Sequence, residues 1–164
     1  MAEMKFKFTI QPYQTEAVDS VVGVFAGQPF NDHFTYRRDV EIKRDVTNWM
    51  PSDEELYMGF ANAKVQLDYG QLLDNIHRIQ ARNNIKLSDS LKSGGLGVCS
   101  LDVEMETGTG KTYVYIKTMF ELNKLYGWSK FIVVVPSIAI REGVQKSFET
   151  MREHFKAYYG KIIR

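Results

Sequence analysis

Residues 105–112 read Met-Glu-Thr-Gly-Thr-Gly-Lys-Thr, a run that has the form of a phosphate-binding loop. Its glycines let backbone N–H groups turn inward around phosphate oxygens. Lys111 supplies a positive charge for the terminal phosphates, and the Thr112 hydroxyl is suited to binding Mg²⁺. The helix expected after the loop directs its positive end at the same anion. The residues expected to line a nucleoside triphosphate are Thr107, Gly108, Thr109, Gly110, Lys111 and Thr112.

The residues on either side of this loop predict a strand before it and a helix after it. Residues 101–105 alternate between apolar and acidic side chains, as in a strand. Residues 111–126 have apolar side chains near helical spacing, with Gly127 as the expected stop. The apolar run at 131–135 predicts a second, buried strand, and residues 141–158 predict an amphipathic helix. This order of elements predicts an α/β fold with right-handed parallel crossovers.

The general loop pattern begins with glycine, whereas this chain has Met105 there. A flexible glycine-rich turn is therefore the simpler alternative. The expected order of strand, loop and helix favours phosphate binding over that turn.

The first half of the chain predicts further elements. Proline near its start and a broad apolar face predict a helix at 12–26, and apolar spacing predicts another at 71–83. Alternating side chains at 34–46 suggest a strand or ribbon, and a capping box at 52–55 predicts a helix start. Residues 88–97 are rich in serine and glycine, which indicates a mobile loop.

Composition narrows the class of protein. A chain of 164 residues is long enough for one domain with a real core. The formal net charge of +1 gives no overall signature of nucleic-acid or membrane binding, so any DNA contact must be local. A single cysteine, Cys99, excludes an internal disulfide and fits a reducing cytoplasm. The sequence shows neither an apolar run of membrane-spanning length nor a secretion signal. We therefore expect a soluble, cytoplasmic protein.

Three motifs lie far apart in the chain. They are Gln-Pro-Tyr-Gln at 11–14, the loop at 105–112, and Val-Val-Val-Pro-Ser at 133–137 with Arg141 beyond it. Together they resemble the amino-terminal end of a superfamily 2 helicase motor, and more closely the restriction (Res) subunit of type III restriction-modification enzymes. The loop of that family begins with methionine, which accounts for the missing glycine. The resemblance implies a partial RecA-like P-loop motor domain with parallel strands flanked by helices.

The resemblance also implies roles for single residues. A glutamine at the position of Gln14 reads the adenine edge in the family, although an exposed polar residue is the alternative. Ser137 and Arg141 are implied to contact the backbone of DNA, although a helix cap and a solvated charge explain them nearly as well. Tyr13 is interpreted as a core residue.

The resemblance covers residues 5–26 and 98–158. Residues 27–97 offer no usable motif for this resemblance, so they are expected to form a mostly helical insertion or accessory unit. Residues 1–164 are then expected to belong to one motor domain, with its P-loop α/β portion at residues 98–164.

Hydrolysis of ATP also needs a second acidic motif, which is not visible after Thr112. Lys111 and Thr112 are its expected catalytic residues and Mg²⁺ its expected cofactor. The chain by itself is expected to bind nucleotide weakly at best and not to hydrolyse it. It is interpreted as an amino-terminal fragment of an ATP-dependent DNA translocase or helicase subunit of a type III restriction endonuclease. The resemblance implies double-stranded DNA, a DNA methyltransferase subunit, and the remaining motor and nuclease domains as partners.

Several alternatives stay open at the level of the sequence. A type I restriction motor or a DNA repair helicase would carry similar motifs. A small P-loop kinase would suit the chain length, but the expected second strand ends in Pro136-Ser137 and lacks a kinase's acidic residue. A non-catalytic nucleotide-binding or protein-interaction module is the third possibility.

Overall fold

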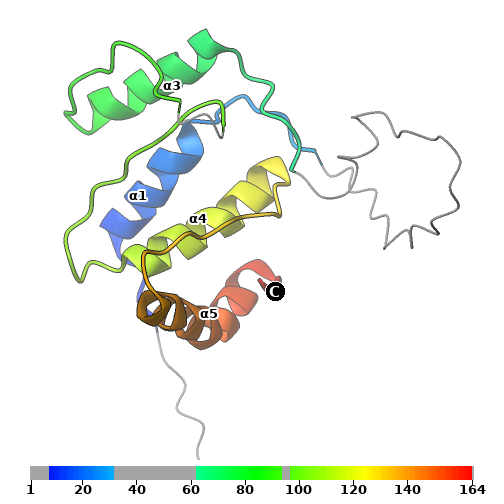
Figure 1. The fold of residues 1–164 in the computed structure, drawn as a ribbon. Coiled ribbons are helices and arrows are strands. Elements are labelled where there is room, and N and C mark those ends of the chain that lie inside the picture. The colour runs from blue at the N-terminus through cyan, green and yellow to red at the C-terminus, as the bar shows by residue number, and fades with distance from the viewer. Residues whose placement is uncertain (1–7, 32–61, 94–96, 164) are drawn as a thin grey trace, which may run out of the picture.

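The computed structural model describes residues 8–31, 62–93 and 97–163. The helices in these ranges are α1 (Pro12–Gly23), α3 (Tyr69–Arg82), α4 (Lys111–Tyr126) and α5 (Ile138–Tyr159). Their order in space is α3, α1, α4, α5, with α4 between α1 and α5 (Figure 1). The strand or ribbon predicted at 34–46 and the capping box at 52–55 lie outside the described residues.

Helix α4 is the centre of the structure because it packs on both sides. Its side towards α1 joins one core cluster, made of Val18, Val22, Val114, Leu122, Tyr126 and Trp128. Its side towards α5 joins another, made of Tyr113, Ile116, Phe120, Met151 and Phe155. A helix that is buried on two sides needs apolar residues around most of its circumference. This explains why α4 has no single apolar stripe.

Local signals set the ends of the helices. Gly127 ends α4 in the left-handed conformation (φ +79°), and its N–H donates to the Asn123 carbonyl at 3.0 Å. Any larger residue there would collide with the Asn31 carbonyl. The predicted stop and the predicted bounds of α4 are therefore confirmed. Helix α3 starts with a capping box that the sequence reading missed, in which Asp68 and Gln71 each bond the other's backbone N–H.

The buried Asn75 fastens α3 to the end of α1. Its Nδ2 donates to the carbonyl oxygens of Val24 at 3.0 Å and Ala26 at 2.9 Å. Both carbonyls follow the last turn of α1, which ends at Gly23 and not at residue 26 as predicted. One side chain thus satisfies two carbonyls at a helix end.

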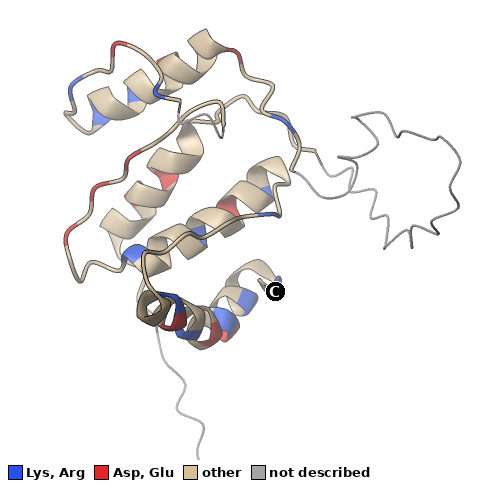
Figure 2. Ribbon diagram, viewed as in Figure 1, with Lys and Arg blue, Asp and Glu red and all other residues tan. Residues whose placement is uncertain are grey.

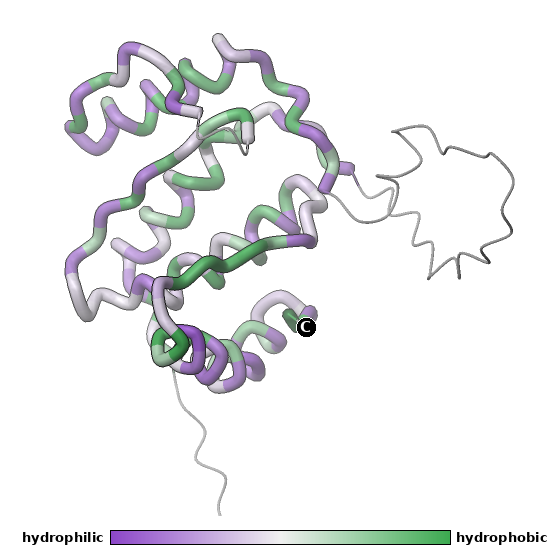
Figure 3. The backbone as a smooth tube through the Cα atoms, viewed as in Figure 1, coloured by the Kyte–Doolittle hydropathy of each residue, from purple (hydrophilic) through white to green (hydrophobic). Residues whose placement is uncertain are grey.

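The predicted α/β fold, a partial RecA-like P-loop domain with parallel strands, is wrong for the described residues, which contain four helices and no strand. The two predicted strands, 101–105 and 131–135, have no regular secondary structure. A strand exists only when its backbone bonds a neighbouring strand, and no described segment pairs with either stretch. Ile132 and Val134 are 92% and 87% exposed, so the second stretch is not buried. Figure 3 shows it as a continuous apolar segment between α4 and α5.

Charged residues of both signs occur along α4 and most densely along α5 (Figure 2). No helix in the described ranges is long and apolar enough to cross a membrane.

Candidate phosphate-binding site

The loop before α4 is curled. Gly108 and Gly110 both adopt the left-handed region, with φ values of +82° and +87°. Residues with a Cβ avoid this region, so the two glycines allow the turn. Between them, Thr109 bonds back to the Glu106 carbonyl through its N–H at 3.4 Å and its Oγ1 at 2.7 Å. The backbone from 106 to 110 is therefore a closed turn and not an extended connection.

The N-terminus of α4 has no side-chain cap. Gly110 is the N-cap residue, and no side chain bonds the first turn. The first N–H with a partner inside the helix is that of Val114, which donates to Gly110. The N–H groups of residues 111–113 therefore have no acceptor within the helix. Lys111 is exposed beside them, and the space next to Gly108 is open. This combination suits an anion.

Helix α1 contacts the loop through two side chains. Two side chains of its first turn donate to the Thr109 carbonyl, Gln14 through Nε2 at 3.0 Å and Tyr13 through Oη at 3.2 Å. Gln14 is nearly buried, and its amide lies against Gly110 so closely that a Cβ there would collide with it. The interpretation of Tyr13 as a core residue is wrong, because this side chain is 46% exposed. Its hydroxyl bonds the loop, a contact that the sequence reading missed.

Beside the loop, a buried polar group links α1, α4 and α5. Lys117 is only 4% exposed, and its Nζ donates to Thr15 Oγ1 at 3.1 Å. On the α5 side, His154 Nε2 lies 3.2 Å from the Tyr113 hydroxyl. Burial lowers the pKa of His154, and the charge of Lys117 lowers it further. In sequence, a lysine inside a helix resembles an ordinary surface charge, so only the packing reveals this group.

The predicted DNA contacts lie at the start of α5. Ser137 is the N-cap residue, and its Oγ accepts from the Ile140 N–H at 3.3 Å. Arg141, in the first turn, is exposed. Among the described residues no hydrogen bond joins either of them to the loop before α4. Ser137 thus acts as a helix cap, and the Arg141 side chain is accessible to solvent.

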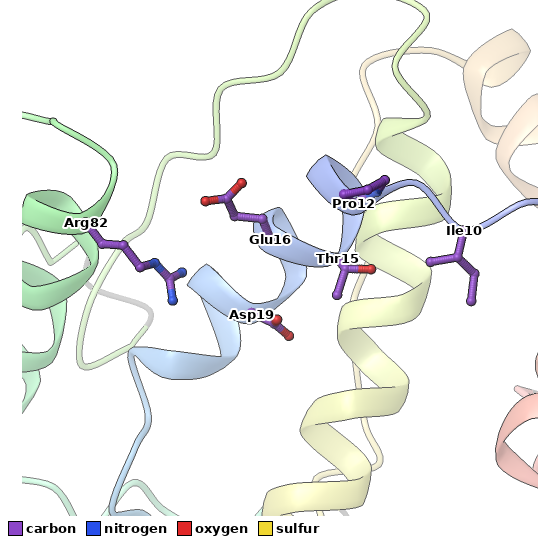
Figure 4. Close-up of a pocket in the computed structure, with 6 residues that line it drawn as sticks. All are labelled: Ile10, Pro12, Thr15, Glu16, Asp19 and Arg82. Atoms are coloured by element: carbon purple, nitrogen blue, oxygen red, sulfur yellow. The ribbon is translucent and has the colours of Figure 1, made fainter.

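An open cavity of about 480 Å³ lies at the start of α1, on another surface (Figure 4). Its lining residues are Ile10, Pro12, Thr15, Glu16, Asp19 and Arg82. Two carboxylates and one guanidinium line it, and the guanidinium already donates to Ser20 Oγ at 3.2 Å. Carboxylates repel a polyphosphate, so this cavity is a poorer phosphate site than the loop.

The described residues contain no group of three His, Cys, Asp or Glu side chains that could hold a metal ion. Magnesium in nucleotide sites needs few protein ligands, because phosphate oxygens and waters complete its coordination shell. The half-buried Thr112 hydroxyl, in the first turn of α4, is a ligand of the required kind. The residues present therefore fit a magnesium ion that arrives with a nucleotide.

Comparison with known proteins identifies related sequences. The profile of the family described as "Type III restriction enzyme, res subunit" matches residues 77–164. The EcoP15I Res subunit of Escherichia coli is 34% identical over 162 residues, which cover 96% of this chain and 14% of the relative. The EcoPI Res subunit of Escherichia phage P1 is 32% identical over 155 residues, again 14% of the relative. The StyLTI Res subunit of Salmonella typhimurium is 42% identical over 86 residues, or 51% of this chain and 9% of that relative. All three are named as subunits of type III restriction-modification enzymes, and the chain spans about a seventh of the first two.

Proposed function

The chain belongs to the type III restriction enzyme Res subunit family, and on that premise we propose that the loop before α4 holds the phosphates of ATP. The main support is the uncapped N-terminus of α4 behind two left-handed glycines, with Lys111 exposed beside it. The residues proposed to hold the phosphates are Thr107, Gly108, Thr109, Gly110 and Lys111. Thr112 is the proposed ligand of Mg²⁺, which neutralises charge on the phosphates when it is bound.

We also propose that Gln14 contacts the adenine base. Its Nε2 already donates to the Thr109 carbonyl, so its Oε1 is the atom that would accept from the adenine amino group. One side chain would then touch both the base and the phosphate loop. In this proposal α1 contributes to nucleotide choice as well as to the shape of the loop.

We propose that these 164 residues bind ATP without steady turnover. Hydrolysis needs an acidic side chain at the metal and another at the attacking water. The acidic residues after Thr112 lie on helices and are Glu121 in α4 and Glu142, Glu149 and Glu153 in α5. Continuous ATP hydrolysis by this chain with Mg²⁺ and DNA would contradict the proposal.

For the whole protein we propose an ATP-dependent DNA translocase or helicase subunit of a type III restriction endonuclease, which acts on double-stranded DNA in the cytoplasm. Its partners would be a DNA methyltransferase subunit and its own further motor and nuclease domains. Residues 27–97 are proposed to be an insertion in the motor domain. The three relatives are all type III Res subunits, which favours this function over a type I motor, a repair helicase or a kinase.

Titration calorimetry with ATP tests the phosphate site. Lys111→Ala removes the exposed ammonium at the loop and should weaken ATP binding by about tenfold or more, because charge-assisted contacts to phosphate are strong. Lys124→Ala is the matched control, since Lys124 is 62% exposed at the other end of the same helix. Equal ATP affinities for the two variants would rule out the loop as the phosphate site.

The proposed DNA contact can be tested separately. Ser137→Ala and Arg141→Ala should each weaken binding to DNA of any sequence, and the loss for Arg141 should shrink as salt is raised. Arg152→Ala, which removes another exposed arginine of α5, is the control. A loss of DNA affinity as large for Arg152→Ala would show that α5 binds DNA only through its general charge.

A further inference from the structure

Tyr115 in α4 has a buried hydroxyl without a hydrogen-bond partner among the described residues. Buried polar atoms are nearly always bonded, so an exception needs an explanation. The Tyr115 ring is held by Phe148 of α5, with the ring centroids 6.4 Å apart. The ring thus packs against α5, while its oxygen makes no bond.

Tyr115 and Thr112 lie on the same side of α4. The two residues are three apart in α4, so they share a face of the helix, and long helical side chains lean towards the N-terminus. Burial raises the pKa of the Tyr115 phenol, and the nearby Thr112 hydroxyl lowers it in part. The Thr112 hydroxyl therefore influences the Tyr115 phenol, although the phenol oxygen has no hydrogen-bond partner among the described residues.

A hydroxyl that binds a cation must direct a lone pair at the metal and its proton elsewhere. Threonine has one proton to donate and two lone pairs, so the proton needs an acceptor on the side away from the metal. The Tyr115 oxygen is an acceptor of this kind. A bond from the Thr112 hydroxyl to this oxygen would give the buried phenol oxygen the partner that it lacks in the described structure.

We propose that Tyr115 is a positioning residue for Mg²⁺, whose phenol oxygen accepts the Thr112 proton and thereby turns the Thr112 lone pair towards the cation. This inference rests on the proposed function, because it requires Thr112 to bind Mg²⁺ beside a nucleotide. It also gives α5 a role at the site, since Phe148 holds the phenol in place.

The test measures ATP affinity by calorimetry with Mg²⁺ and again with EDTA, and compares the two affinities for each protein. Tyr115→Phe keeps the ring and removes only the hydroxyl. We expect its melting temperature to be unchanged or higher, because an unpaired buried oxygen is gone. We expect its affinity in EDTA to be unchanged, and the gain in affinity that Mg²⁺ gives to fall by about threefold to tenfold.

The matched control is Tyr126→Phe at the far end of α4. That hydroxyl donates to the Val22 carbonyl at 3.0 Å. Its loss should lower the melting temperature and leave the gain from Mg²⁺ as it is. A second comparison uses Thr112→Val, in which Tyr115→Phe should have no further effect on the gain. A purely structural role for Tyr115 would not produce this dependence on Thr112.

The outcomes separate the two proposals. If the unchanged chain binds ATP and Tyr115→Phe keeps the full gain from Mg²⁺, the role of Tyr115 is refuted and the phosphate site stands. The role of Tyr115 is also refuted, and the phosphate site also stands, if Mg²⁺ does not raise the ATP affinity of the unchanged chain. If the unchanged chain binds no ATP in either condition, the proposed function fails and the role of Tyr115 fails with it.

Discussion

The contact between Gly110 and Gln14 predicts that an alanine at Gly110 destabilises the fold more than an alanine at Gly108 of the same loop. Both Gly108 and Gly110 are left-handed, and an alanine in that region costs about 1 to 2 kcal/mol. At Gly108 the added methyl group meets nothing within 4 Å, so this strain is the whole expected cost. At Gly110 the methyl group would collide with the Gln14 amide. The displaced amide would lose its bond to Thr109, which adds about 0.5 to 1.5 kcal/mol.

We therefore expect Gly110→Ala to lower the free energy of unfolding by about 1.5 to 3.5 kcal/mol, and Gly108→Ala by about 1 to 2 kcal/mol. Urea denaturation followed by helical circular dichroism measures both values. In a Gln14→Ala background the collision is absent, so the cost of Gly110→Ala should fall to that of Gly108→Ala. Equal costs for the two glycines in the unchanged background would refute the idea that α1 holds the loop through Gln14.

Three further predictions concern the helices. Gly143→Ala should raise the free energy of unfolding by about 0.5 to 1 kcal/mol in urea denaturation, because Gly143 lies inside α5 with open space beside it. Asn75→Ala should lower it by about 2 kcal/mol in the same assay, because two carbonyls after α1 lose their donor; an unchanged value would mean that water replaces the amide. The pKa of His154 is below its usual 6.5 in the folded chain, so its contribution to stability is present above about pH 6.5 and is lost as pH falls through the folded pKa. The melting temperature should therefore drop on acidification, and His154→Gln should reduce that drop; an equal drop in the variant would exclude His154 as a cause.

The helices were predictable because their signals are local. The bounds of α4 follow from apolar spacing and from Gly127, a residue that can take the left-handed conformation at a helix end. The predicted start of α5 is three residues late, because the apolar spacing of this helix begins only at Val144, whereas the Ser137 cap sets the observed start. The capping box at Asp68 was missed although both of its residues are visible in the sequence.

The strands were not predictable in the same way. Residues 101–105 alternate and residues 131–135 are apolar, which are the patterns of strands. A pattern gives a segment the preference for an extended backbone, but the hydrogen bonds of a sheet come from other segments. In the described residues those partners are missing, so both stretches remain irregular.

For the candidate site, the sequence by itself determined the chemistry of the loop and the family to which the chain belongs. Glycines at 108 and 110, followed by Lys111 and Thr112, are covalent facts that specify which groups can meet a phosphate. Only the tertiary structure decided what surrounds them. It places the Gln14 and Tyr13 donors on the Thr109 carbonyl, nearly a hundred residues away in the chain, and it leaves the Tyr115 oxygen buried without a bond. Contacts of this kind depend on how α1 and α5 pack against α4, and packing between distant segments leaves no periodic signal in the sequence.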